Sequence, residues 1–423
     1  MSLADGRSPY GRAARLLSRG LTEARALDRA DPLARLRSRF HLPPGKVYLC
    51  GNSLGLQPKR AGEYVNAELR DWARLGVDGH LRAAHPWLPY HELVTKASAR
   101  VVGAKPLEVV VMNTLTVNLH LMLISFYRPT KTRFKIILER SAFPSDQYAL
   151  ASQVRLHGLD PKRALVELAP RPGEDALRED DVLSAIEREG GKTALVLLGN
   201  AQYLTGQAFD MKAISSAAKR QGCRVGFDLA HGAGNLALAL HDSGADFAVW
   251  CTYKYLNAGP GGLSGCFVHE RWARARLPRL EGWWGTSKRE RFAMKPSFQP
   301  LPGAEGWQLS NPPILQLAAL RASLELFDEA GMPALRKKSE RLTGYLEGLL
   351  SRLPNCRVVT PKRRGCQLSM RVTGDRKRLV RRLAAAGVVC DFREPDIVRV
   401  APVPLYNRFE DAWCFAEAMA AHA

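Results

Sequence analysis

The sequence has no apolar run that approaches the length needed to cross a bilayer, which is about 20 residues for a helix. Its N-terminus, residues 1–39, is rich in arginine but lacks the apolar core of a signal peptide. Acidic residues also interrupt the pattern of a transit peptide there, namely Asp5, Glu23, Asp28 and Asp31. The sequence therefore predicts a cytoplasmic protein with no membrane attachment.

Motifs for metals and nucleotides are missing as well. There is no C-x-x-C pair and no metal-ligand spacing, and neither a G-x-G-x-x-G nor a G-x-x-x-x-G-K-[ST] loop occurs. Several cysteines lie in apolar stretches, so we interpret all of them as reduced packing residues. The eight cysteines are Cys50, Cys223, Cys251, Cys266, Cys356, Cys366, Cys390 and Cys414.

Acidic residues are scarce relative to basic ones, 41 against 62, which gives a formal charge of +21. A charge of this size can indicate nucleic-acid binding. However, no nucleic-acid motif accompanies it, and the basic residues lack interleaved aromatics. We predict a solvated basic surface and no nucleic-acid partner, with attraction of an anionic cofactor and substrate as a secondary effect. The basic clusters are Arg12–Arg39, Lys337–Lys338, Lys362–Arg364 and Arg376–Arg382.

The 423 residues, 46% of them hydrophobic, are enough for two to three domains with a large core. Apolar strand-like runs alternate with helical patterns, which predicts an α/β fold with a mostly parallel, doubly wound sheet of the seven-stranded type. Residues 356–423 predict a small C-terminal α+β domain. The predicted division is an N-terminal arm and substrate loop at 1–60, a large cofactor-binding domain at 61–313 and a small domain at 314–423. The runs lie at 108–112, 133–138, 164–168, 193–198, 223–228 and 247–252.

Lys254 directly follows the last of these runs, between two tyrosines and before a Gly/Pro turn. A lysine in such a place is costly unless it is used. Asp228 ends the preceding run. The interval between Asp228 and Lys254 leaves room for one crossover connection between neighbouring strands. Pyridoxal phosphate (PLP) needs a lysine for a Schiff base and a carboxylate that keeps its pyridine nitrogen protonated. The pair therefore predicts a PLP site.

Two upstream segments fit the same cofactor. A polar-to-helix transition places Leu115 and Thr116 at a helix N-terminus, which suits a phosphate, although a plain threonine cap explains it equally well. Residues 141–146 follow the run at 133–138, so Phe143 is placed to stack on a ring and Asp146 to form a hydrogen bond with it. Taken alone, Ser145 or Asp146 is more typical of a helix cap.

Other candidates stay open at this level. Arg399 lies within an apolar strand, and its buried guanidinium needs either a substrate carboxylate or an internal salt bridge. The glycine-rich segment at 51–55 is on its own an ordinary turn, and a lone loop histidine such as His80 is usually a surface residue. Trp283, next to glycine, indicates either a binding loop or core packing.

Together these segments resemble the kynureninase family, PLP-dependent hydrolases of the aspartate aminotransferase (type I) fold. The resemblance covers the chain from about residue 47 to the C-terminus. The matching motifs are Gly51–Pro58 (GNSLGLQP), Met112–His120 (MNTLTVNLH), Phe143–Asp146 (FPSD), Gly226–His231 (GFDLAH), Tyr253–Ala258 (YKYLNA) and Arg399–Asn407 (RVAPVPLYN).

By this resemblance Lys254 carries the cofactor, Asp228 pairs with the pyridine nitrogen and Tyr253 is the acid that protonates the cleaved fragment. Some family members carry a hydroxyl residue near the cofactor at the position where this sequence has Gly199. If that residue makes a side-chain contact, Gln202, Tyr203 and Thr205 are candidates to supply it here. No metal is implied. The implied cofactor-binding residues are Leu115, Thr116, Phe143, Pro144, Ser145, Asp146, Asp228, His231, Tyr253, Lys254, Trp283 and Asn311. The implied substrate-binding residues are Ser53, His80, Asn311 and Arg399.

The resemblance implies hydrolysis of L-kynurenine or its 3-hydroxy form to anthranilate or 3-hydroxyanthranilate and L-alanine. It also implies a role in tryptophan degradation and NAD biosynthesis, and a homodimer with shared sites. Because His80 and Asn311 are polar, we expect 3-hydroxykynurenine to be preferred. A cysteine desulfurase or aminotransferase of the same fold is the alternative, but a desulfurase needs a mobile loop thiol. A DNA-binding regulator would need a winged-helix domain, for which residues 1–45 are too few.

Overall fold

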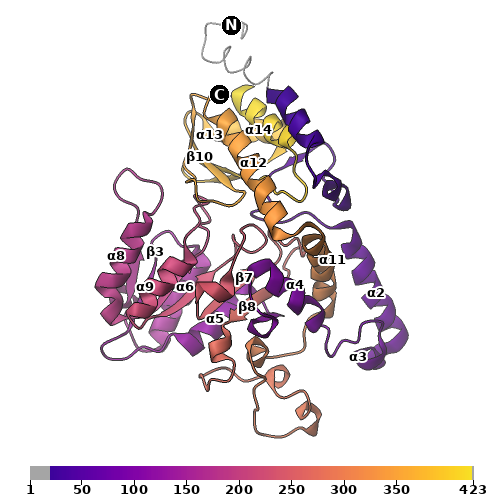
Figure 1. Ribbon diagram of the computed structural model, residues 1–423, viewed down its shortest axis with the longest axis vertical. Helices are drawn as coiled ribbons and strands as arrows, with labels where there is room; N and C mark the ends of the chain where they lie inside the picture. Colours follow the sequence, from indigo (N-terminus) through magenta and orange to yellow (C-terminus); the bar gives the residue numbers. More distant parts are fainter. Residues whose placement is uncertain (1–19, 422–423) are drawn as a thin grey trace, which may run out of the picture.

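The computed structural model describes residues 20–421. The first part of the predicted N-terminal arm, with the start of its basic cluster at Arg12, lies outside the described residues. Within residues 20–421 the chain forms a larger part around one sheet and a smaller part around another, and Figure 1 shows the smaller part, with α12, α13 and α14, above the larger. None of the helices in this range is long and apolar enough to span a membrane.

A seven-stranded sheet forms the centre of the larger part, with strand order β2-β8-β7-β6-β5-β3-β4. Strands β3 to β7 run parallel, and β8 is antiparallel to both of its neighbours. The predicted mostly parallel α/β fold is therefore confirmed. The strands are β2 (Val109–Met112), β3 (Lys135–Glu139), β4 (Leu165–Leu168), β5 (Thr193–Gly199), β6 (Arg224–Asp228), β7 (Phe247–Cys251) and β8 (Ser264–Val268).

Both faces of this sheet are covered by helices. Every residue of β2, β7 and β8 is buried, as expected for strands that read as continuous apolar runs. Side chains alternate between two hydrophobic clusters: Val109 and Val111 belong to one, Val110 and Met112 to the other. Helices α5 and α6 cover the second cluster, and α4, α8, α9 and α11 cover the first.

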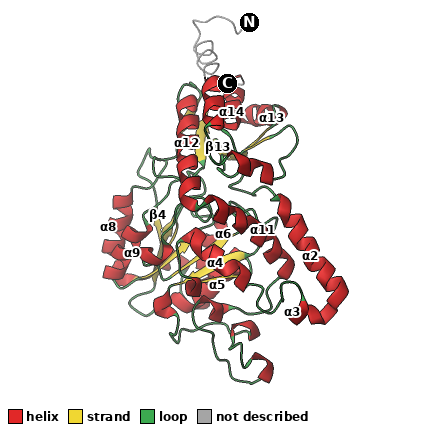
Figure 2. Ribbon diagram, turned by 45° about the vertical axis from the view of Figure 1, so that its right-hand side comes forward, coloured by secondary structure: helices red, strands yellow, loops and turns green. Residues whose placement is uncertain are grey.

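The helices of the larger part are those that the alternating pattern predicts, with short additional turns between them. Figure 2 shows them in red around the yellow strands. They are α2 (Lys59–Leu75), α3 (Gly79–Arg82), α4 (Glu92–Val102), α5 (Leu115–Phe126), α6 (Pro144–Leu156), α7 (Pro161–Ala164), α8 (Glu179–Glu189), α9 (Met211–Arg220), α10 (Leu240–Ser243) and α11 (Ile314–Ala330).

The smaller part is built on a four-stranded antiparallel sheet of order β12-β13-β10-β9. Its elements are α12 (Met332–Leu350), β9 (Cys356–Val358), β10 (Leu368–Val372), α13 (Arg376–Ala385), β11 (Val388–Val389), β12 (Asp391–Arg393), β13 (Ile397–Val400) and α14 (Phe409–Ala421). Strand β1 (Val47–Tyr48) pairs in parallel with β11, so the N-terminal segment is tied to the C-terminal part of the chain. The predicted domain boundaries at residues 60 and 313 stay a prediction. Helix α11, just after the second boundary, packs against α2 and α4.

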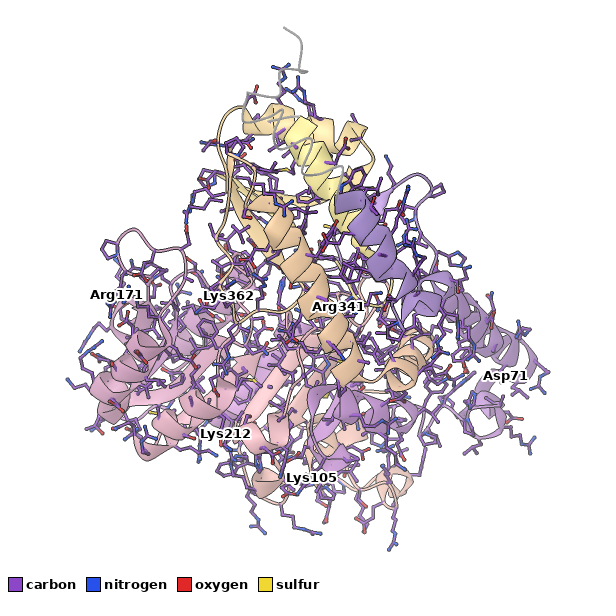
Figure 3. All side chains as sticks on the ribbon, turned by 45° about the horizontal axis from the view of Figure 1, so that its top comes forward. Asp71, Lys105, Arg171, Lys212, Arg341 and Lys362 are labelled. Carbon is purple, nitrogen blue, oxygen red and sulfur yellow. The ribbon has the colours of Figure 1, made fainter. Side chains whose placement is uncertain are left out.

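Basic side chains are spread over many elements rather than gathered on one. The labelled Lys105, Arg171, Lys212, Arg341 and Lys362 come from separate parts of the fold, and all are exposed (Figure 3). Many arginines form ion pairs with nearby carboxylates, for example Arg171 with Asp181 at 2.7 Å. Such exposed pairs stabilise the fold by only about 0–1 kcal/mol each.

Candidate active site

The carboxyl ends of the parallel strands meet at one edge of the large sheet and bring the predicted chemistry together. Asp228 ends β6, Gly199 ends β5 in register with it, and Glu139 ends β3. Lys254 lies three residues beyond the end of β7. Ligands of open α/β sheets bind at such an edge, so the topology places these groups where a ligand is expected.

A pocket of about 620 Å³, open to solvent on one side, lies at this edge. Most of the predicted cofactor-binding residues line it: Leu115, Thr116, Phe143, Ser145, Asp146, Asp228, His231, Tyr253 and Lys254. The other lining residues are Glu139, Ala142, Gly199, Ala201, Gln202, Tyr203 and Ala230.

Lys254 is fixed by the backbone around it and points into the pocket. Its Nζ lies 3.1 Å from His231 Nε2 and 5.8 Å from the centre of the Phe143 ring. The backbone N–H of Gly55 donates to the carbonyl of Tyr253 at 2.9 Å, and a Cβ at Gly55 would lie 2.2 Å from the carbonyl oxygen of Lys254. The glycine-rich loop therefore packs directly on the lysine loop, and only glycine fits at position 55.

Two buried carboxyl groups face the lysine. Burial raises the pKa of Asp228, while the Ala230 N–H, which donates to it at 2.6 Å, and the charge of Lys254 oppose this rise. Burial and the neighbouring Asp228 raise the pKa of Asp146 well above its ordinary value. Of the two carboxyl groups, Asp228 is the one whose ionised form its neighbours support, and Asp146 is the one whose surroundings more strongly favour a proton. Oδ1 of Asp146 has no hydrogen-bond partner among the described residues.

His231 is a neutral imidazole in this pocket. Burial, and then the charges of Lys254 and Arg399, hold its pKa well below the usual value. Its Nε2 accepts from the Lys254 ammonium, and its Nδ1 has no partner among residues 20–421. Because Nε2 accepts, Nδ1 carries the ring proton and can donate to an acceptor atom of a ligand.

The start of α5 forms the polar end of the pocket. Its N-cap residue, Thr114, makes no side-chain cap, so the N–H groups of the first turn lack a side-chain acceptor. The hydroxyl groups of Thr116 and Ser145 lie 2.7 Å apart beside this turn. Free N–H groups, two hydroxyls and the positive end of the helix dipole suit a phosphate. Together with the Phe143 ring and Asp228, these residues fit PLP.

Six predicted residues do not line the pocket of the single chain: Pro144, Trp283, Asn311, Ser53, His80 and Arg399. Pro144 is the first residue of α6. Trp283 donates through Nε1 to the carbonyl of Arg291 at 3.0 Å, and its ring is 41% exposed. Asn311 and Ser53 are exposed. His80 packs edge-on against Trp87, with ring centres 5.5 Å apart, and its buried Nδ1 has no partner in the described part of the chain.

Arg399 also lies outside the pocket lining, directly behind it. Its guanidinium is buried and donates to the carboxylate of Asp391 and to the carbonyl of Tyr203, a residue that does line the pocket. The internal salt bridge, one of the two explanations for a buried arginine here, is therefore present. Its Nε has no partner among the described residues, so one donor remains for a ligand.

Glu139 is the residue that the sequence interpretation missed. Its Oε1 accepts the backbone N–H of Gly199 at 3.2 Å, and burial raises its pKa to about 8. The oxygen would lie 3.3 Å from a Cβ at position 199, so the carboxyl fills the space beside that glycine. The signal was present, because Glu139 ends its strand just as Asp228 ends β6. Gln202 and Tyr203, which were candidates to act near Gly199, also line the pocket, whereas Thr205 does not.

Curated relatives match almost the whole chain. A kynureninase from Myxococcus xanthus is 65% identical over 95% of this chain and 96% of its own length. A kynureninase from Koribacter versatilis is 56% identical over 94% of this chain and 96% of its own length. The chain belongs to the kynureninase family. The family model of the kynureninase C-terminal domain matches residues 335–419.

Solved structures show the same fold at much lower identity. The lyase C-DES, with glycine covalently linked to its PLP cofactor, superimposes with a TM-score of 0.77 at 19% identity, covering 92% of this chain and 99% of that one. A cysteine desulfurase from Thermococcus onnurineus has a TM-score of 0.77 at 18% identity, covering 92% and 97%. These likenesses place a member of the kynureninase family on the fold of PLP-dependent type I enzymes.

The raised pKa of Glu139 predicts a pH-dependent stability. The fold favours the protonated carboxyl, so the wild-type apoprotein loses stability as the pH rises from the unfolded value, 4.5, through about 8. Glu139→Gln stays neutral and keeps the acceptor for the Gly199 N–H. We expect its free energy of unfolding, relative to wild type, to increase by about 4 kcal/mol between pH 5 and 9.

Thermal unfolding of the cofactor-free proteins across this pH range measures the difference. The control is Glu167→Gln, which alters an exposed glutamate on the neighbouring strand β4. A difference between Glu139→Gln and wild type that stays constant with pH would show that Glu139 is ionised throughout.

Proposed function

We propose that this protein hydrolyses L-kynurenine or 3-hydroxy-L-kynurenine to anthranilate or 3-hydroxyanthranilate and L-alanine. It is thus a hydrolase acting on a carbon–carbon bond in a ketone, and its relatives of 56–65% identity are named kynureninases. The observation that carries the proposal is the meeting of Lys254 and Asp228 in one pocket. The pocket holds a lysine to anchor a cofactor and a carboxylate to pair with its ring nitrogen.

The cofactor is pyridoxal phosphate, and each of its parts has a matching group in the pocket. Lys254 would anchor it, Asp228 would face the pyridine nitrogen with Asp146 beside it, and Phe143 would stack on the ring. The first turn of α5 with the Thr116 and Ser145 hydroxyls would bind the phosphate. When bound, PLP supplies an electron sink that stabilises negative charge on a substrate carbon.

The remaining chemistry is proton transfer by this chain's own groups. Lys254 is placed to move a proton from the substrate Cα, because its Nζ is held at the pocket wall by the neutral His231. Burial raises the pKa of Tyr253, so its phenol stays protonated and can donate to the three-carbon fragment that becomes alanine. Water adds to the γ-carbonyl, and the bond between Cβ and Cγ breaks.

Substrate contacts are proposed for Ser53, His80, Asn311 and Arg399. The free Nε of Arg399, behind Tyr203, suits the substrate carboxylate once that group enters the pocket. The Gly51–Gly55 loop that carries Ser53 lies against the lysine loop. His80 offers an unpartnered ring nitrogen for a polar group on the aromatic ring.

A cysteine desulfurase activity is not favoured. That reaction needs an accessible thiol on a mobile loop, but none of the eight cysteines is exposed, and four of them are buried. Burial also raises the pKa of Cys251, the cysteine that precedes Lys254 most closely, to about 11. The likeness to desulfurases at 18–19% identity concerns the fold alone.

A homodimer with shared sites is part of the proposal. Trp283, Phe292 and Met294 are large apolar residues that are 41%, 59% and 69% exposed, and Val117 at the start of α5 is 43% exposed. Exposed large apolar residues that gather in a patch are typical of an interaction surface. The exposed Asn311 would then reach the phosphate of the neighbouring subunit. We also propose a cytoplasmic enzyme that acts in tryptophan degradation and in the synthesis of NAD from tryptophan.

Lys254→Ala is expected to abolish turnover, because no other group both anchors the cofactor and moves the proton. Purified wild type incubated with PLP and L-kynurenine should give anthranilate, detected by its fluorescence, with an equal amount of alanine. The variant should give neither, and should lose the visible absorbance of the covalently bound cofactor. Lys337→Ala, at an exposed lysine of α12, is the control and should behave as wild type. Normal activity of the Lys254 variant would disprove the assignment.

Shared sites predict that two inactive chains can restore each other. Lys254→Ala and Asn311→Ala proteins are mixed under conditions that exchange subunits, and one of the two sites in a mixed dimer should then be intact. We expect activity to return toward a quarter of the wild-type level for random exchange, because half of the dimers are mixed and each has one good site. Each parent incubated alone is the control. No recovery after exchange has been demonstrated would contradict shared sites.

The polar residues proposed to contact the aromatic ring of the substrate, His80 and Asn311, predict a preference for 3-hydroxykynurenine. A site built to bind a hydroxyl leaves buried polar groups unpaired when the hydroxyl is absent, at a cost of about 1–3 kcal/mol. We therefore expect kcat/KM to be about tenfold or more higher for the hydroxylated substrate. His80→Phe should reduce this preference, while His41→Phe, at an exposed histidine, should not. Equal kcat/KM values in wild type would show that His80 does not bind the hydroxyl.

A further inference from the structure

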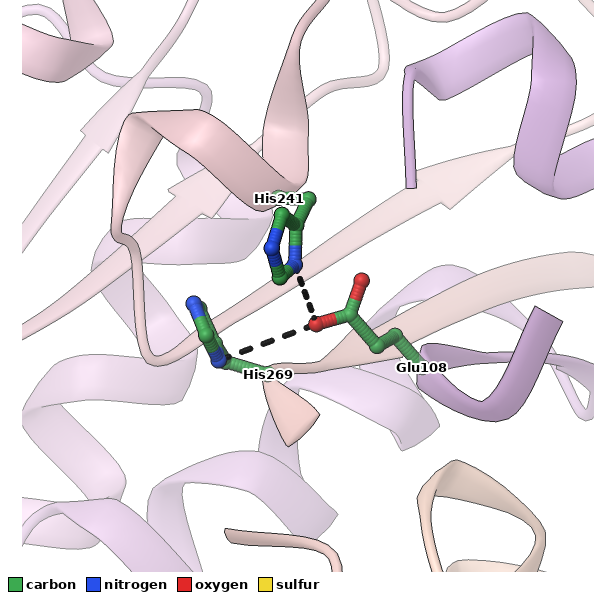
Figure 4. A group of neighbouring side chains, drawn as sticks. All are labelled: Glu108, His241 and His269. Atoms are coloured by element: carbon green, nitrogen blue, oxygen red, sulfur yellow. Dashed lines mark hydrogen bonds and ion pairs between the residues drawn. The ribbon is translucent and has the colours of Figure 1, made fainter. Parts of the chain in front are cut away.

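A second group of ligand-type side chains lies at the edge of the sheet opposite the active site. Figure 4 shows Glu108, His241 and His269, which come from three separate segments. Glu108 immediately precedes β2, His241 belongs to α10, and His269 immediately follows β8. Because β2 runs towards the pocket and β8 away from it, both strand ends lie far from Lys254.

The distances within this group are close to those of a tetrahedral metal site. Glu108 Oε1 lies 2.9 Å from His241 Nδ1 and 3.6 Å from His269 Nδ1, and all three ligand atoms lie within 4.8 Å of one another. Zn²⁺ binds nitrogen and oxygen ligands at about 2.0–2.2 Å, which puts neighbouring ligands of a tetrahedron roughly 3.3–3.5 Å apart. Any pair of ligand atoms that now lies nearer the 4.8 Å limit would have to close toward this spacing.

His269 already has the tautomer that a metal requires. Its Nδ1 accepts the backbone N–H of Arg271 at 3.2 Å, so this nitrogen carries a lone pair and no proton, and a metal would replace that N–H on the lone pair. Burial, and then the charge of Arg271, lower the pKa of His269, which keeps the ring neutral. The two imidazole rings lie 4.9 Å apart between centres, tilted by 32°.

Glu108 is held in place as metal-binding carboxylates usually are. It is fully buried, and its Oε2 accepts the N–H of Lys105 while its Oε1 accepts the N–H of Glu270, each at 2.9 Å. These contacts orient the carboxylate independently of the histidines. The hydrogen-bonding capacity that remains on the Glu108 carboxylate faces the space between the imidazole rings of His241 and His269.

His241 now donates its Nδ1 proton to Glu108. When a metal takes that position, the proton moves to Nε2 of the same ring, where the carboxylate oxygen of Glu270 lies 3.9 Å away. A ligating histidine whose other nitrogen faces a carboxylate is the usual arrangement at zinc sites. No proton is gained or lost in this exchange, and water can complete the coordination.

Nearby cations are already paired with other carboxylates. Lys105 Nζ contacts Glu270 at 2.6 Å, and Arg271 contacts Asp246 at 2.6 Å. Lys219 is the remaining cation near His269, and burial lowers its pKa. The other candidate cluster in the described chain, His91 with Glu92 and Glu305, differs in this respect. There Lys288 Nζ lies 2.8 Å from Glu92 and 2.9 Å from Glu305, so an ammonium already binds between the carboxylates.

We propose that Glu108, His241 and His269 form a Zn²⁺-binding site that joins the start of β2, α10 and the end of β8. Its distance from Lys254 makes the site structural rather than catalytic. Bound metal would stabilise the edge of the sheet at which β2 and β8 pair.

The test uses untagged holoenzyme stripped of metal by EDTA and dialysed, titrated with ZnCl2 by calorimetry. We expect one Zn²⁺ per chain at micromolar affinity or tighter, and a higher Tm with zinc than without. The double variant His241→Ala/His269→Ala should lose at least about 100-fold in affinity and the zinc-dependent rise in Tm. Its cofactor absorbance reports whether it has folded.

The control is His41→Ala/His157→Ala, which removes two exposed histidines elsewhere and should bind zinc as wild type does. Glu108→Gln is a second variant that removes the charge and keeps one oxygen as an acceptor for one of the two backbone N–H groups, and it should also bind weakly. Absence of stoichiometric binding in wild type would overturn the proposal. Equal zinc affinity in the His241/His269 variant would overturn it as well, because the metal would then bind elsewhere.

Discussion

The active site is constrained by the cost of burying charge, because its three buried carboxyl groups cannot all be ionised at once. Glu139, Asp146 and Asp228 crowd the pocket with a single ammonium, that of Lys254. An unpaired buried carboxylate costs several kcal/mol, so groups without a partner retain their protons. Burial raises the pKa of Asp228 too, but the Ala230 N–H and Lys254 oppose that rise, so Asp228 is the carboxyl whose charge is best supported. This is the group proposed to pair with a protonated ring nitrogen.

The fold supplies this balance through its topology. Parallel strands end at the same edge, so residues far apart in sequence, such as Glu139 and Asp228, become neighbours without any local signal that joins them. The antiparallel strand β8 then returns the chain to the opposite edge, where His269 meets Glu108 and His241. The candidate active site and the Glu108, His241 and His269 group thus lie at opposite edges of one sheet.

The sequence predicted the parts that depend on local pattern. Apolar runs ending in a functional residue identified Lys254 and Asp228, and the order of strands and helices identified the α/β fold. It left Arg399 undecided, because its partner Asp391 is set by the register between β12 and β13. It missed Glu139 although this residue ends its strand as Asp228 does, because no second motif residue accompanied it and only the neighbouring strands bury it. The roles proposed for Trp283 and Asn311 depend on a second subunit, which local patterns do not describe.

The central claim is that Asp228 keeps the ring nitrogen of bound PLP protonated while Asp146 and Glu139 stay neutral beside it. Nitrogen NMR of the enzyme loaded with PLP labelled with ¹⁵N in the ring measures this directly. The account predicts the chemical shift of a protonated pyridine nitrogen at neutral pH, and the shift of an unprotonated nitrogen in Asp228→Asn. An unprotonated nitrogen in the wild-type enzyme would contradict it.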